Sequence, residues 1–156
     1  MSGRSDIEEK LRELIVEGQR LAPDTYYRAW VAKNEWWQEV RSTFQQYDVL
    51  LTPTAACPPF AVGRDTVGSV AGKPVSFYGW MPFTAPFNLT GQPAISIPAG
   101  FTSGGLPVGL QIVGRRHADS TVIGLAAAYE RRWPWADRLP PVLTGTMATP
   151  PASRSQ

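Results

Sequence analysis

The chain has 156 residues, of which 43% are hydrophobic and 18% charged, and its formal net charge is +2. This composition indicates one globular domain and excludes an intrinsically disordered chain, which combines low hydrophobicity with high net charge. The charge is too small for a typical nucleic-acid-binding domain, and the single cysteine excludes an internal disulfide.

Two amphipathic helices are predicted at the start of the chain. Ser5 and Glu8 fit a capping box, and Gly18 fits the position after the last turn. A longer helix is predicted to begin near Pro23. Apolar residues recur along it at intervals of three and four: Tyr26, Trp30, Val31, Trp37, Val40 and Phe44. The short link between the helices predicts a helical hairpin, and core packing is the preferred interpretation of the tryptophans.

A buried strand is predicted next, followed by a long irregular segment. Residues 48–54 form an apolar run that stops at a proline, which is typical of a strand ending in a loop. Residues 55–80 are rich in Pro, Gly and small residues without a sustained period. Because loops of this length are often functional, this segment is a candidate part of a site.

A short helix and a hairpin follow in the second half. Residues 82–91 fit one or two helical turns ended by Gly91, and residues 93–98 and 108–114 read as strands. Ser103–Gly104–Gly105 is a turn signal between these strands. The apolar stretches Ala94–Ile97 and Leu110–Val113 favour the middle of a sheet covered on both faces.

The last predicted helix runs from about Asp119 to Arg132 and packs on the sheet through one apolar stripe. Trp133–Pro134–Trp135 ends it. Residues 144–156 are predicted to be a disordered tail, so that the domain spans residues 1–143. The whole is of the α/β class.

The sequence offers few candidate residues for a catalytic, metal or cofactor site. Cys57 is best interpreted as a small buried or half-buried thiol, and His117 as a capping or surface residue beside two arginines. One histidine and one cysteine cannot supply a common metal site, and no phosphate loop or dinucleotide fingerprint is present, so we expect no cofactor. Arg115–Arg116 and Arg131–Arg132 are the basic clusters, with solvated surface preferred over phosphate contact.

Three blocks in the middle of the chain resemble one family. They are Tyr47–Thr54, Phe83–Pro98 and Leu106–Gly114, and they occur in the order and at the spacing seen in amidase-signature hydrolases. The resemblance extends over roughly residues 5 to 140 and corresponds to the C-terminal portion of those enzymes. It implies part of the amidase-signature fold, a mixed β-sheet core covered by helices, here with an N-terminal helical hairpin.

The resemblance implies hydrolysis of carboxylic amides by a serine nucleophile, a second serine in a cis peptide and a lysine. In the family these groups lie in the N-terminal half. This chain has no Ser-Ser pair, and Lys10, Lys33 and Lys73 stand in contexts unlike the catalytic one. No catalytic residue can therefore be assigned here, and the chain is expected to be inactive alone.

The resemblance also implies that Thr54, Met81 and Phe83 form part of the substrate-binding pocket. In the glutamine-hydrolysing subunit of tRNA-dependent amidotransferases, an acidic residue stands two places before the position of Phe83. Here that position is Met81, which cannot pair with an ammonium group. Met81 therefore favours an amidase for less polar amides over the amidotransferase subunit.

Two alternatives remain: a fragment of that amidotransferase component, and a non-catalytic binding or assembly module. The expected partners are a small amide substrate and either the missing N-terminal half or further copies of the chain, with no nucleic acid and no membrane. Unpaired apolar strand edges predict association of the isolated chain. Because the chain has neither an apolar signal segment nor a run of about 20 apolar residues, it is expected to be cytoplasmic.

Overall fold

A computed structural model describes residues 9–140; the predicted capping box and the tail at 144–156 lie outside them. Four helices are placed: α1 (Glu9–Gln19), α2 (Pro23–Gln46), α3 (Ala85–Thr90) and α4 (Asp119–Arg132). Five strands are placed: β1 (Val49–Pro53), β2 (Ser69–Val70), β3 (Lys73–Pro74), β4 (Ala94–Phe101) and β5 (Pro107–Gly114). None of the described helices is long and apolar enough to cross a membrane.

The main sheet has three antiparallel strands in the order β1-β5-β4. β4 and β5 form the predicted hairpin, and β5 pairs on its other side with β1, from Val49 opposite Gly114 to Pro53 opposite Leu110. Within residues 9–140, β5 is therefore the one central strand of this sheet. The strand predicted at 48–54 is confirmed as β1, but its predicted burial is wrong, because β1 is an edge strand and Leu51 is 53% exposed.

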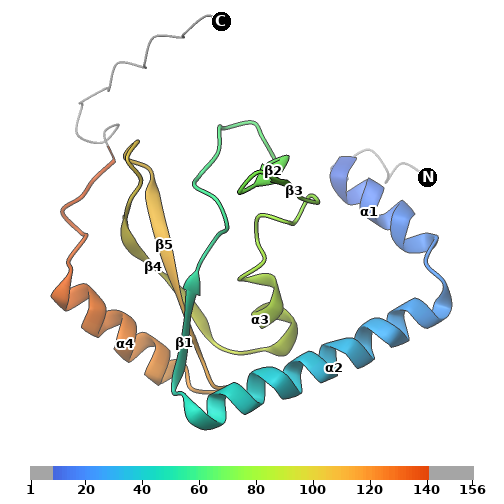
Figure 1. The fold of residues 1–156 in the computed structure, drawn as a ribbon, viewed down its shortest axis with the longest axis horizontal. Helices are drawn as coiled ribbons and strands as arrows, with labels where there is room; N and C mark the ends of the chain where they lie inside the picture. The colour runs from blue at the N-terminus through green and yellow to red at the C-terminus, as the bar shows by residue number, and fades with distance from the viewer. Residues whose placement is uncertain (1–8, 141–156) are drawn as a thin grey trace, which may run out of the picture.

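The sheet lies between helices on both faces (Figure 1). On one face α4 packs against β4 and β5, where Ile97 and Ile112 form one buried cluster with Val122 and Ala126. On the other face Val113 forms a buried cluster with Phe44 of α2 and Phe87 of α3. Successive residues of β5 thus enter opposite cores, as the alternation of a strand requires.

The N-terminal helices form where they were predicted but do not make a hairpin. α2 begins at Pro23, whose missing N–H costs nothing in a first turn. α1 ends at Gln19, so that Gly18 lies inside it, and α1 turns away from α2 rather than packing along it (Figure 1). An amphipathic pattern predicts a helix but does not identify the surface that it covers.

Only the last turns of α2 reach the core, where Val40 and Phe44 are buried. Tyr26 is 80% exposed and Trp30 is 52% exposed. Trp36 and Trp133 are also exposed, so the prediction of core packing is wrong for these tryptophans, whereas Trp135 packs against the buried cluster beneath α4. The first part of the apolar stripe of α2 is therefore largely uncovered by the other described residues.

The segment between β1 and α3 is irregular as predicted, apart from a two-stranded ribbon of β2 and β3. The ribbon turns at Ala71 and Gly72, which both have positive φ as a two-residue hairpin turn requires. α3 ends at Gly91, in the left-handed conformation with its N–H donating to the carbonyl of Phe87. This turn sets the direction in which β4 enters the sheet.

Candidate functional site

A line of polar side chains crosses the sheet on the face that carries Val113. Gln111 stands two residues before Val113 on β5, opposite Thr52 of β1 and Ser96 of β4. Its side chain is 4% exposed and donates from Nε2 to Thr52 Oγ1 at 2.9 Å and to the carbonyl oxygen of Phe83 at 2.7 Å. The face therefore changes from an apolar core to a polar strip, and Gln111 ties the segment before α3 to the sheet.

Beyond Gln111 the strip ends in a pair of hydroxyl groups. Thr54 follows β1 and donates its backbone N–H to the carbonyl of Gly109 at 3.0 Å. Its Oγ1 lies 2.7 Å from Oγ of Ser96, so that β1 and β4 are joined over β5. A Cβ at Gly109 would lie 2.7 Å from Thr54 Oγ1 and 2.8 Å from Ser96 Oγ. The hydroxyl pair exists because position 109 has no side chain.

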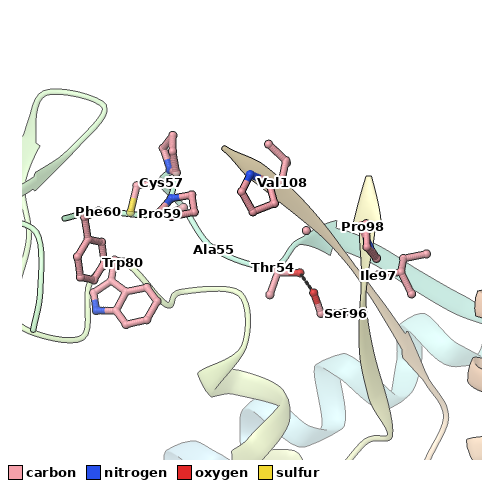
Figure 2. A pocket seen from close by; sticks show the side chains of 14 residues that line it. Thr54, Ala55, Cys57, Pro59, Phe60, Trp80, Ser96, Ile97, Pro98 and Val108 are labelled. Atoms are coloured by element: carbon pink, nitrogen blue, oxygen red, sulfur yellow. Dashed lines mark hydrogen bonds between the residues drawn. The ribbon is translucent and has the colours of Figure 1, made fainter. Parts of the chain in front are cut away.

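These hydroxyls line a pocket of about 680 Å³ at the end of the sheet. Figure 2 shows its two sides: Phe60 and Trp80 from the irregular segment, and Pro98 and Val108 from the hairpin. The rings of Phe60 and Trp80 meet edge to face, with centroids 5.4 Å apart. The backbone N–H of Ala56 donates to the carbonyl of Trp80 at 3.0 Å and holds the two parts of that wall together.

None of the residues that line this pocket is charged. Apolar and aromatic side chains with a few oriented polar groups are typical of small-molecule sites of this size. The walls suit an uncharged, largely apolar group, and the two hydroxyls can exchange hydrogen bonds with one polar atom of it. The indole Nε1 of Trp80 is buried and has no hydrogen-bond partner among the described residues.

The three predicted binding residues are placed differently. Thr54 lines the pocket, whereas Met81 and Phe83 are half-buried and do not. Their neighbour Trp80 lines it instead, and the carbonyl of Phe83 accepts from Gln111. A role of Thr54, Met81 and Phe83 in substrate binding stays a prediction.

No sequence pattern singles out Ser96, Phe60 or Trp80 as pocket residues. Phe60 and Trp80 are twenty residues apart in a segment without periodicity, so nothing in the sequence pairs them. Cys57 also lines the pocket as the half-buried thiol that was predicted. Across residues 9–140, no three His, Cys, Asp or Glu side chains are grouped to hold a metal ion.

Replacing Gly109 by alanine is expected to separate Thr54 from Ser96 and to lower the free energy of unfolding by about 1–2 kcal/mol, because the added methyl overpacks the site. Urea unfolding followed by circular dichroism measures the change. Gly104→Ala is the matched control, since its nearest neighbour would be Thr102 Oγ1 at 3.8 Å. Equal stabilities of the two variants would contradict the role given to Gly109.

The family model described as Amidase matches residues 3–123 of the chain. An acylamidase of Rhodococcus erythropolis is 35% identical over 139 residues, which cover 88% of this chain and 29% of that enzyme. A subunit of the glutamyl-tRNA(Gln) amidotransferase from Dehalococcoides mccartyi is 40% identical over 136 residues, covering 84% and 27%. The chain thus spans less than a third of the length of these relatives.

Solved structures show the same fold. A bacterial aryl acylamidase of the amidase-signature enzymes superposes with a TM-score of 0.76 and 31% identity, over 85% of this chain and 28% of that one. A 6-aminohexanoate cyclic dimer hydrolase, whose structure was determined with its substrate, superposes with a TM-score of 0.75 and 26% identity, over 90% and 31%. The layers of Figure 1 are therefore a segment of a larger fold.

Proposed function

This chain belongs to the amidase family, and from that premise we propose that it is the C-terminal part of an amide hydrolase, supplying one wall of the substrate pocket. The catalytic serines and lysine would come from an N-terminal part. The chain alone would then be inactive, with Thr54 at the pocket and Met81 and Phe83 close to it. The domain would end near residue 143, and the enzyme would work in the cytoplasm.

The observation that carries this proposal is the uncharged pocket at the end of the sheet. Its hydroxyl pair and aromatic wall can hold an apolar part of an amide, but they include no base to activate a nucleophile. The chain covers 29% of a related acylamidase, so we expect it to contain only part of the active site.

The exposed apolar surface of the helices also supports the proposal. Leu11 and Ile15 of α1, and Tyr26 and Trp30 of α2, are each at least 44% exposed. Both outer strands of the main sheet, β1 and β4, have one unpaired edge within the described residues. A further part of the same fold, or another copy of the chain, would cover these surfaces.

The absence of charge favours less polar amides over glutamine. Recognition of an α-ammonium group needs an acidic partner, and the lining residues include none. Because glutamyl-tRNA(Gln) amidotransferase components are among the similar proteins, a fragment of such a component is the second candidate. A non-catalytic assembly module is the third, supported by the exposed apolar surface.

Complementation tests the proposal. We expect the chain alone to hydrolyse neither aliphatic nor aryl amides, and to do so once co-expressed with the N-terminal part of a related acylamidase. Aryl amides should be preferred over glutamine, and release of ammonia or arylamine measures turnover. The controls are the N-terminal part alone and a mixture in which its nucleophilic serine is alanine.

Each other outcome is informative. Turnover by the chain alone would mean that a catalytic group lies among these 156 residues. Preference for glutamine would favour the amidotransferase component. If a well-folded monomer gave no turnover with any complementing part, the assembly module would be favoured.

A further inference from the structure

A second hollow lies at the other end of β5 from the substrate pocket. It encloses about 330 Å³, and three of its lining residues are arginines: Arg41 of α2 and Arg115 and Arg116 after β5. Trp37 and Gln92 also line it. The sequence shows Arg115 and Arg116 as neighbours, but only the fold brings Arg41 to them.

Each of the three guanidinium groups makes a local contact, and the contacts differ in strength. The Cζ atom of Arg41 lies 5.5 Å from the ring centroid of Trp37, within cation–π range. A Cβ at Gly91 would lie 3.4 Å from Nη2 of Arg116, so that guanidinium rests against the end of α3. Arg115 approaches Asp48 at 3.6 Å in an exposed and therefore weak ion pair.

The hollow presents hydrogen-bond donors with little opposing charge. No acidic residue lines it, and the only carboxylate paired with any of the three arginines in the described chain is that of Asp48. The Oε1 atom of Gln92 accepts from Thr90 Oγ1, which leaves the Gln92 amide nitrogen as a donor. Like charges brought together repel one another, and a bound anion relieves that repulsion.

We propose that this hollow binds a phosphate group, either free or as the monoester of a small molecule. Several guanidinium groups approaching from different elements suit a tetrahedral dianion with oxygens on all sides, and each can donate a charge-assisted hydrogen bond. Residues of this chain line the hollow, and phosphate binding there would be independent of the proposed amide hydrolysis.

Titration of the full, ¹⁵N-labelled chain with inorganic phosphate at constant ionic strength tests the proposal. The Nε–H signals of Arg41, Arg115 and Arg116 and the indole N–H signal of Trp37 should shift along one saturable curve. Phosphate should also raise the thermal unfolding midpoint relative to chloride, as binding to the folded state requires. Glycerol phosphate distinguishes a monoester, which would bind more tightly, from free phosphate.

Four variants distinguish a specific binding site from a general effect of positive charge. Arg41→Gln and Arg116→Gln should each raise the dissociation constant by about fivefold or more, because each removes a charge-assisted donor. Arg116→Lys should fall between, since it keeps the charge but loses the planar fork. Arg64→Gln in the exposed segment removes the same charge and should leave the constant nearly unchanged.

Several results would overturn the proposal. They are a linear, non-saturating response to phosphate, or an equal loss of affinity in Arg64→Gln and Arg116→Gln. RNA that bound through these arginines far more tightly than phosphate would instead identify a nucleic-acid contact.

Discussion

Replacing Ile112 by alanine is expected to lower the free energy of unfolding by about 3 kcal/mol, the usual cost of truncating a buried isoleucine. Ile112 is 1% exposed and belongs to one buried cluster with Ile97 of β4 and Val122 of α4. The truncation opens a cavity that a strand paired on both sides cannot easily close. Because small domains are stable by only about 5–15 kcal/mol, a chain with exposed apolar helices would be left close to unfolding.

Ile123→Ala provides the matched control. Ile123 is 61% exposed on α4, next to Val122 in the sequence, and alanine has the higher helix propensity. Its replacement should change the free energy of unfolding by less than about 0.5 kcal/mol. Chemical unfolding followed by circular dichroism measures both variants. Equal destabilisation by the two replacements would show that the face of α4 has been assigned wrongly.

Replacing Gln111 by methionine is expected to cost about 2 kcal/mol, because the Phe83 carbonyl and the Thr52 hydroxyl each lose a hydrogen-bond donor. Methionine keeps the length of the side chain, so the change removes polarity more than volume. The segment that leads into α3 should loosen first, since Gln111 is its tie to the sheet. The Trp80 wall of the pocket belongs to that segment.

Two measurements check this expectation together. The free energy of unfolding should fall relative to Gln46→Met, which changes an exposed glutamine at the end of α2. Limited proteolysis should cut residues 55–83 faster in Gln111→Met than in the original chain. A loss of stability without faster cleavage there would mean that Gln111 supports the sheet alone and does not hold the pocket wall.

The sequence predicted the elements well where local signals were strong. Pro23 marks the start of α2, Gly91 the end of α3, and Ser103–Gly104–Gly105 lies in the turn between β4 and β5. The bounds of α4 were also predicted, because its apolar stripe and the tryptophan–proline pair after it agree. Each of these signals acts over a few neighbouring residues, which is the range that a sequence pattern can report.

Predictions that depended on distant surfaces were less successful. The pattern of α2 extends from Tyr26 to Phe44, yet only its last part meets the sheet. The hydroxyl pair of Thr54 and Ser96 joins residues 42 apart and depends on the missing side chain of Gly109. Likewise, Arg41 lies near Arg115 and Arg116 only because the fold brings α2 next to the end of β5. Family resemblance pointed to Thr54 as a binding residue, which stays a prediction, and the structure was needed to find that Trp80 lines the same pocket.

The apolar cluster beneath α4 has a consequence for the order of folding. Apart from Val49, its members come from residues 95–135, so one short stretch supplies β4, β5 and α4 together with the side chains that join them. Contacts between residues close in sequence cost little loop-closure entropy and form early. We therefore expect this C-terminal unit to collapse first and to act as the template on which β1 and the end of α2 later dock. The pocket then takes shape last, since its aromatic wall belongs to the segment with the fewest regular elements.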